Sequence, residues 1–314
     1  MKIMRIVTIV VAAIAGAAIA VVAALHDRST VAPPPVKKVY ISLPAAPESY
    51  IGVYAGQSPR SFAGVSAFTN SSSVKPNVGM YYSGWLEPFQ SKFATAASRH
   101  GAVPLIQINP TGISMAAIAS GRYDGYLTSY AAAVRSYGRP VIIGFGHEMN
   151  GDWYSWAYRH SSPVTFVAAW RHIVTLFRTA GAGNVTWLWT VNVIARPNDI
   201  PDPRPWWPGS AYVTWVGIDG YYGSSAMTFA RLFGPTIVAV RALTNAPILI
   251  GETGVIDTAR QPAQIQDLFA GIHTYGLLGF TWFDAIGKRD WRLVNPDAIV
   301  AFHQGAQAYG RLAS

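Results

Sequence analysis

The sequence predicts an α/β domain folded as a (β/α)8 TIM barrel, preceded by an apolar N-terminal helix and a Pro-rich linker. Three observations predict this fold class. The chain has 314 residues, 51% of them hydrophobic, which is enough for one large core. From residue 50 onward, eight short apolar runs alternate with helix-like segments. Polar residues gather where the apolar runs end, at the face of a parallel barrel where loops carry functional groups.

Residues 1–26 are predicted to be a signal peptide or a membrane anchor. Lys2 and Arg5 precede an apolar run over residues 6–25. A signal-peptide core usually has about 7–15 residues and a membrane span about 20, so the length favours an anchor. The many alanines favour a cleaved signal, and both alternatives stay open. Either places the rest of the chain outside the cytoplasm, secreted or anchored by residues 6–25.

Residues 27–48 are predicted to be a linker, and the folded domain is expected at 49–314. Three consecutive prolines at 33–35 stiffen the linker, and Lys37 and Lys38 keep it solvated. This composition is typical of a stalk between a membrane and a domain.

Eight apolar runs are predicted to be strands, because each is short and bounded by turn-forming residues. Their nearly continuous apolar character indicates strands that are buried on both faces, as in a parallel sheet. The predicted strands cover residues 50–55, 78–83, 103–108, 141–145, 185–191, 213–219, 247–251 and 278–283.

The segments between these strands are predicted to be helices, and a Pro- and Trp-rich stretch at 195–210 a long loop. A doubly wound open sheet is the competing fold. That fold calls for a glycine-rich phosphate loop after the first strand, and residues 54–58 do not supply one. The predicted helices cover residues 59–68, 88–99, 114–120, 123–137, 163–179, 227–243, 262–275 and 296–309.

The net charge of +9 does not indicate nucleic-acid binding. Residues 1–38 hold five Lys or Arg and one Asp, so the remainder has 19 basic and 14 acidic residues and no basic run. The absence of cysteine excludes disulfides and Cys-based metal sites. His147 lacks a second histidine at ligand spacing, so no metal and no cofactor is predicted. The domain is expected to be a monomer.

Two glutamates are the main candidates for chemistry. The chain has only four, and Glu148 and Glu252 stand at the ends of the fourth and seventh predicted strands. In a closed barrel both can point into one cleft. Cleavage of a glycosidic bond requires two such carboxyl groups, one to protonate the leaving oxygen and one to attack the anomeric carbon or activate water. The pair therefore predicts a glycoside-cleaving site.

Aromatic residues follow the same strand ends and suit a sugar site, because the apolar face of a pyranose ring stacks on aromatic rings. Trp153 and Trp156 come just after Glu148, and Tyr221 and Trp282 follow or end later strands. These four residues are the candidates for substrate binding.

Two motifs resemble those of glycoside hydrolase family 26, a family of retaining enzymes on (β/α)8 barrels. The first is HEMNG at residues 147–151 followed by Trp153, and the second is GETG at 251–254. The segment GRYD at 121–124 is also similar to the family. Most known members are endo-β-1,4-mannanases, and the resemblance runs from about residue 50 to the end.

The resemblance implies a role for each candidate. Glu148 takes the position of the acid/base and Glu252 that of the nucleophile in a double displacement. The resemblance also places His147 and Trp153 beside the acid/base as substrate-binding residues. By the same resemblance, Tyr221 hydrogen-bonds the nucleophile, while Trp282 forms the platform under the sugar in the −1 subsite.

One position departs from the family pattern. Members often carry Arg three residues before the motif histidine, where this chain has Gly144. An arginine there would reach the cleft floor, so its loss is expected to alter the nucleophile's electrostatics or the choice of substrate.

The sequence thus predicts a retaining hydrolase that cleaves internal β-1,4 linkages of a polysaccharide, with β-mannan as the first candidate. Mixed-linkage β-glucan, xylan and an envelope polysaccharide are the alternative substrates. A glycan-binding envelope protein without activity is the alternative from another class. Retention of Glu148 and Glu252 argues against it, since a pure binder needs neither.

Overall fold

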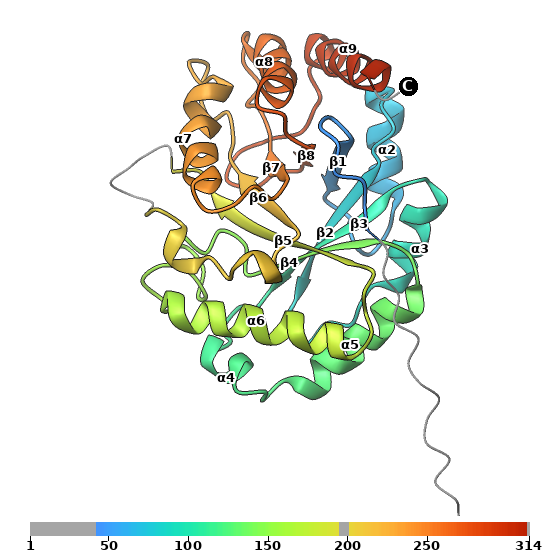
Figure 1. Cartoon of the computed structure of the whole chain (residues 1–314). Helices are drawn as coiled ribbons and strands as arrows, with labels where there is room; N and C mark the ends of the chain where they lie inside the picture. The colour runs from blue at the N-terminus through green and yellow to red at the C-terminus, as the bar shows by residue number, and fades with distance from the viewer. Residues whose placement is uncertain (1–41, 195–200, 313–314) are drawn as a thin grey trace, which may run out of the picture. The chain divides into compact units, whose positions relative to one another are not determined.

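The computed structural model describes residues 42–194 and 201–312 (Figure 1). The predicted signal or anchor at 1–26 and the linker as far as residue 41 lie outside the described residues and remain predictions. None of the helices in the described ranges combines the length and the apolar character that crossing a bilayer requires.

Eight parallel strands close into a barrel in chain order, which confirms the predicted fold class. β8 pairs with β1 from Tyr50–Gly279 through Ala55–Asp284, so the sheet has no open edge and the doubly wound alternative is wrong. The strands are β1 (Tyr50–Ala55), β2 (Val78–Gly84), β3 (Val103–Asn109), β4 (Val141–Phe145), β5 (Val185–Asn192), β6 (Trp215–Asp219), β7 (Ile248–Thr253) and β8 (Gly279–Asp284).

Helices follow the strands along the chain and lie around the barrel (Figure 1). The longest internal one begins after Ser162, whose side chain accepts a hydrogen bond from the Thr165 amide, and it has Pro163 at its first position. The helices are α2 (Ala63–Ser72), α3 (Ser91–Arg99), α4 (Met115–Ala119), α5 (Asp124–Tyr137), α6 (Pro163–Thr179), α7 (Phe229–Arg241), α8 (Gln261–Thr274) and α9 (Pro296–Leu312).

Several element boundaries differ from the prediction, and two of the differences have a local cause. α2 begins at Ala63 instead of residue 59, because Pro59 lies in a turn that ends at Ser61, whose Oγ accepts the Ala63 amide at 3.0 Å. β6 begins at Trp215 instead of residue 213, because a 3₁₀ turn over Ser210–Tyr212 occupies the residues just before it.

The barrel interior changes from apolar to polar along its axis. Leu105 on β3 is followed on the same face by Gln107, and Leu188 on β5 by Thr190, since strand side chains alternate between faces. The apolar interior cluster consists of Tyr50, Val78, Met80, Leu105, Ile142, Leu188, Trp215, Leu249 and Leu278. The polar layer therefore lies toward the C-terminal strand ends, where the sequence predicted the site.

Candidate active site

A cavity of about 620 Å³ lies at the C-terminal ends of the strands. It holds both predicted carboxyl groups, Glu148 and Glu252, together with Trp153 and Tyr221. Its wall consists of Tyr82, Asn109, Glu148, Trp153, Tyr154, Asn192, Tyr221, Glu252, Phe283, Gly287, Lys288 and Trp291. Residues from the ends of seven strands, β2 to β8, or the loops after them thus meet in one cavity.

Glu148 lies in the loop after β4, in a conformation that glutamate rarely adopts. Its φ is 54°, in the left-handed region. The loop is held there because the Glu148 amide donates to the Thr190 carbonyl at 2.9 Å and its own carbonyl accepts the Gly151 amide at 2.9 Å. Such strain persists only where surrounding contacts fix it, and it is often found at functional sites.

Two donors hold the Glu148 carboxyl group. The indole Nε1–H of Trp153 donates to Oε2 at 2.7 Å, and the Asn192 amide donates to Oε1 at 2.6 Å. Burial and the charge of Glu252 together raise the pKa of Glu148 to about 7, although the two donors oppose the change. This carboxyl group is therefore protonated in mildly acidic solution.

Glu252 lies within β7 and is held by two phenols. The Tyr82 hydroxyl donates to Oε1 at 2.5 Å and the Tyr221 hydroxyl to Oε2 at 2.8 Å. Burial raises the pKa of Glu252, and these two hydrogen bonds lower it. Burial also raises the pKa of both phenols well above 10, so they remain donors.

His147 lies behind the cavity wall and does not line it. Its side chain is 1% exposed and Nε2 hydrogen-bonds with the Tyr154 hydroxyl at 3.1 Å. Burial lowers the pKa of His147 to about 3, so the ring is neutral. The expected contact with substrate is corrected: His147 supports Tyr154, which does reach the cavity.

Two predicted tryptophan platforms are buried in the core. Trp156 stacks on Tyr154 with ring centroids 4.3 Å apart, and its Nε1–H donates to the His147 carbonyl at 2.9 Å. Trp282 is fully buried and packs against Phe302 of α9. Both predictions as sugar-binding residues are corrected. Because strand residues alternate, Trp282 points to the helix layer while its neighbour Phe283 lines the cavity.

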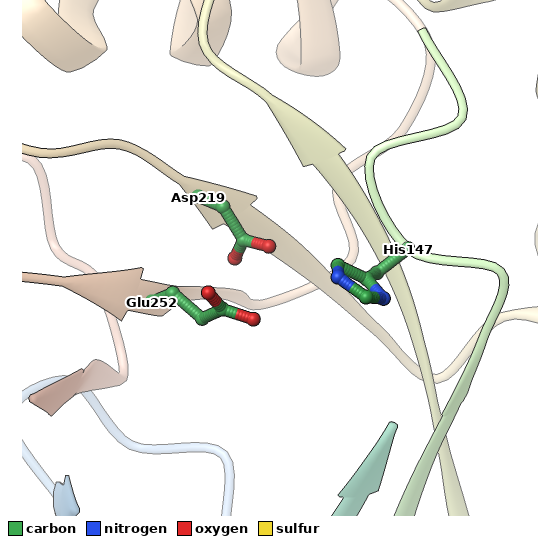
Figure 2. A group of neighbouring side chains, drawn as sticks. All are labelled: His147, Asp219 and Glu252. Atoms are coloured by element: carbon green, nitrogen blue, oxygen red, sulfur yellow. The ribbon is translucent and has the colours of Figure 1, made fainter. Parts of the chain in front are cut away.

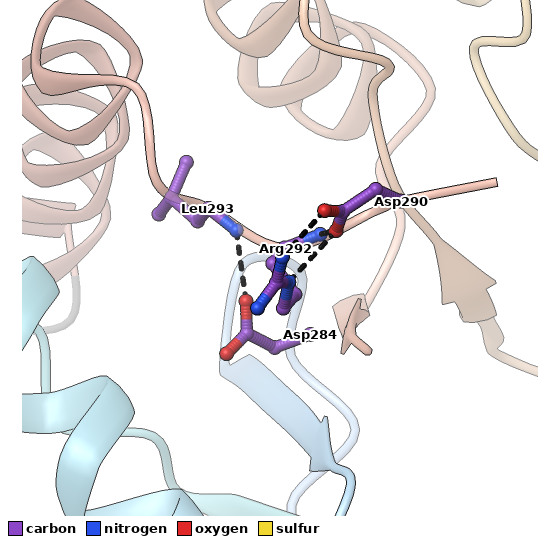
Figure 3. Close-up of polar contacts among 4 residues, drawn as sticks. All are labelled: Asp284, Asp290, Arg292 and Leu293. Atoms are coloured by element: carbon purple, nitrogen blue, oxygen red, sulfur yellow. Dashed lines mark hydrogen bonds and ion pairs between the residues drawn. The ribbon is translucent and has the colours of Figure 1, made fainter. Parts of the chain in front are cut away.

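Trp291 stands in the cavity where the prediction expected Trp282. It comes from the loop after β8, which two contacts hold in shape (Figure 3). The Asp284 carboxylate accepts the Leu293 amide at 2.8 Å, and Arg292 pairs with Asp290 through bonds of 2.9 and 2.6 Å.

The sequence reasoning missed five wall residues in particular: Tyr82, Tyr154, Phe283, Lys288 and Trp291. The alternation of β8 was a signal for Phe283, and the position of Tyr82 near the end of β2 was a weaker one. Lys288 and Trp291 lie in an irregular loop, which has no regular alternation from which the orientation of a side chain could be predicted.

The absence of a side chain at position 144 is explained by Gln107 on the neighbouring strand β3. A Cβ atom at this position would lie 1.9 Å from Oε1 of Gln107, whose Nε2 donates to Thr190 Oγ1 at 3.1 Å. The Gln107 side chain thus fills the space that a side chain at 144 would need.

Asp219, which was not among the predicted site residues, adds a third carboxyl group. It is fully buried at the end of β6, close to Glu252 and His147 (Figure 2). These three residues could present a metal with ligand atoms that lie within 4.8 Å of one another. Because Tyr82 and Tyr221 already donate to both oxygens of Glu252, the group fits a hydrogen-bonded polar layer better than a metal site.

Comparison with known proteins agrees with the site. A sequence model of glycosyl hydrolase family 26 matches residues 54–275. Endoglucanase H from Acetivibrio thermocellus is 30% identical over 275 residues, which cover 82% of this chain and 30% of that protein. The chain thus spans less than a third of that relative's length. β-1,3-xylanase TXYA from a Vibrio species is 26% identical over 132 residues, 39% of this chain and 27% of that protein.

A solved structure shares the fold at low identity. The catalytic domain of the Bacillus sp. JAMB-750 GH26 endo-β-1,4-mannanase aligns with a TM-score of 0.64 and 13% identity, covering 86% of each chain. With the family match over most of the chain, these findings show that the chain belongs to glycoside hydrolase family 26.

Proposed function

We propose that the protein is a retaining glycoside hydrolase that cleaves internal β-1,4 linkages of a polysaccharide. One observation carries the proposal. Glu148 and Glu252 share one cavity, and burial together with the charge of Glu252 raises the pKa of Glu148 to about 7. Glu252 therefore ionises first, which supplies one ionised and one protonated carboxyl group, as the retaining mechanism requires.

In the first step, Glu252 attacks the anomeric carbon and the glycosidic bond to the leaving oxygen breaks. Glu148 gives its proton to that oxygen, so the leaving sugar departs as a neutral alcohol. The hydroxyls of Tyr82 and Tyr221 hold the attacking carboxylate and fix its direction. A covalent glycosyl-enzyme ester remains on Glu252.

In the second step, the ionised Glu148 removes a proton from water. The resulting oxygen attacks the anomeric carbon from the side that the first leaving group vacated, and the ester bond to Glu252 breaks. Two inversions give net retention, and both carboxyl groups return to their starting protonation states. Trp153 and Asn192 keep Glu148 in place while it changes charge.

β-Mannan is the proposed substrate. The similarity to the Bacillus endo-β-1,4-mannanase and the aromatic side chains suited to stack on sugar rings support it. Endoglucanase H and the β-1,3-xylanase support mixed-linkage β-glucan and xylan as alternatives. We place the site outside the cytoplasm, secreted or anchored through residues 6–25, because of the charge order at the N-terminus.

Full-length protein should be assayed for new reducing ends on β-mannan, mixed-linkage β-glucan and β-1,3-xylan, with E148A and E252A as matched controls. We expect β-mannan to be cleaved fastest, and proton NMR of the first product to show the β-anomer. Binding to these polymers without release of reducing ends would favour the glycan-binding alternative. An α-anomer as first product would contradict the double displacement.

A further inference from the structure

Asp219 is a buried acid that the proposed reaction does not use. It ends β6 next to Glu252 in the sheet ladder and is 0% exposed. Within the described ranges, neither of its carboxyl oxygens has a hydrogen-bond partner. An ionised carboxylate in such a position is disfavoured relative to the neutral acid, because it has lost water and only the nearby backbone of Glu252 opposes that loss.

The groups that face Asp219 offer no positive charge. Glu252 on β7 and Glu148 after β4 are acidic, and burial lowers the pKa of His147 to about 3, which leaves that ring neutral. Tyr221, in the loop after β6, is a neutral phenol. In Figure 2 the Asp219 and Glu252 carboxyl groups and the His147 ring lie close together at one end of the barrel.

The polar layer on β3, β4 and β5 adds uncharged groups only. Gln107 and Thr190 hydrogen-bond to each other there, and Gly144 contributes no side chain. A cation at position 144 would have to displace the Gln107 side chain, since its Cβ would meet Gln107 Oε1 at 1.9 Å. Lys288 approaches the site from the cavity wall and lowers the pKa of Glu148, not that of Asp219.

We propose that Asp219 is a positioning residue that works as an uncharged carboxylic acid, keeping its proton so that the negative charge of the cluster resides on Glu252. This inference rests on the proposed function, in which Glu252 must be ionised while Glu148 is protonated. Burial, Glu252 and Glu148 all raise the pKa of Asp219 well above its ordinary value, and only the backbone of Glu252 lowers it.

The proton on Asp219 keeps the roles of the other two acids apart. A second negative charge within 4.8 Å of Glu252 would oppose its ionisation, because like charges interact strongly in a buried site. Glu252 and Glu148 would then titrate closer together, and a smaller fraction of the protein would hold one ionised and one protonated group. The neutral acid avoids this and offers an O–H donor beside the nucleophile.

The conservative variant D219N tests whether Asp219 is a neutral acid or an ionised carboxylate. Asparagine keeps the shape of the side chain and a hydrogen-bond donor but has no charge. We expect kcat/KM of D219N to fall less than about fivefold, with the acidic limb of its pH profile unmoved. D219A removes the donor, so we expect kcat to fall at least about tenfold with little change in KM, and the acidic limb to move to higher pH.

An ionised Asp219 would give the opposite pattern. D219N would then remove a negative charge beside Glu252, so the acidic limb would move to lower pH, and D219N and D219A would lose activity alike. Either result overturns the proposal. Circular dichroism of each variant confirms that the fold is kept.

Infrared difference spectroscopy tests the proton directly, whether or not the protein cleaves any glycan. E148Q and E148Q/D219N are compared at neutral pH, since E148Q removes the other protonated carboxyl group. The difference spectrum should contain a carboxylic-acid C=O band. Carboxylate bands alone would overturn the proposal even if hydrolysis is confirmed. Should D219N unfold, ¹³C NMR of wild-type protein labelled at the aspartate carboxyls decides the same question.

Discussion

The ends of β4 and β7 carry the same residue type in opposite surroundings. Glu148 sits past the end of β4 in a strained loop with φ of 54°, and its donors are an indole and an amide. Glu252 sits inside β7 and accepts from two phenols. Two identical side chains thus differ because of their positions in the fold. In the proposed reaction, the carboxyl group that keeps its proton acts as the acid, and the one that ionises first acts as the nucleophile.

Removal of the β7 carboxylate should have the largest effect. We expect E252A to lower kcat/KM by at least about 10⁴-fold on every cleaved polymer, because the proposed covalent intermediate forms on the carboxylate that this variant removes. Reducing-end assays with wild-type protein measured in parallel give the ratio. Activity of E252A near the wild-type level would show that Glu252 is not the nucleophile.

The loss of activity caused by removing the carboxyl group of Glu148 should depend on the leaving group of the substrate. E148A is expected to lose about 10²–10⁴-fold on polysaccharide, where protonation of the leaving oxygen is needed. On an aryl glycoside with an acidic phenol as leaving group, the first step should be nearly unaffected, and added azide should accelerate the second step. Equal losses on both substrates would assign Glu148 another role.

The phenols at the β7 end should control the acidic limb of the pH profile. Tyr221 donates to Glu252 and thereby lowers its pKa, so Y221F is expected to raise that pKa and move the acidic limb to higher pH, with a loss of about 10–100-fold in kcat. Y222F is the matched control, since the Tyr222 hydroxyl donates to Asp267 instead. An unmoved limb in Y221F would contradict the assignment.

The indole at the β4 end should control the alkaline limb. Trp153 donates to Glu148 and lowers its pKa, which stands at about 7. W153F removes this donor, so we expect the alkaline limb of kcat/KM to move to higher pH, with activity at the optimum reduced less than about tenfold. A limb that moves to lower pH would show that Glu148 does not set it.

The raised pKa of Glu148, at the β4 end, should also be detectable without a substrate, in the pH dependence of the free energy of unfolding. Burial raises the folded-state pKa of Glu148 from 4.5 to about 7. Its proton therefore favours folding below 4.5, and this contribution is lost as pH rises through about 7. E148Q lacks this loss and should be more stable than wild type by up to about 3 kcal/mol near pH 8, and nearly equal near pH 4. Urea titrations at both pH values measure the difference, and a constant difference would contradict the raised pKa.

The barrel and its two cavity glutamates could be predicted from the sequence alone. Buried parallel strands read as continuous apolar runs, so all eight strands were found, and a parallel barrel brings their carboxyl ends to one face. Glu148 and Glu252 therefore had to meet. The motifs around them made their roles readable through the family resemblance.

Which aromatic rings line the cavity could not be predicted from the sequence. Trp156 and Trp282 follow or end strands as Trp153 does, yet both pack into the core, because the direction of a side chain depends on strand register and on the path of each loop. The same holds for Trp291, which an irregular loop carries into the cavity. Two further contacts join residues from different strands. Gln107 fills the space beside Gly144, and Asp219 is buried close to Glu252. Such contacts depend on how side chains from different strands pack across the barrel, and this packing cannot be predicted from the order of residues in the chain.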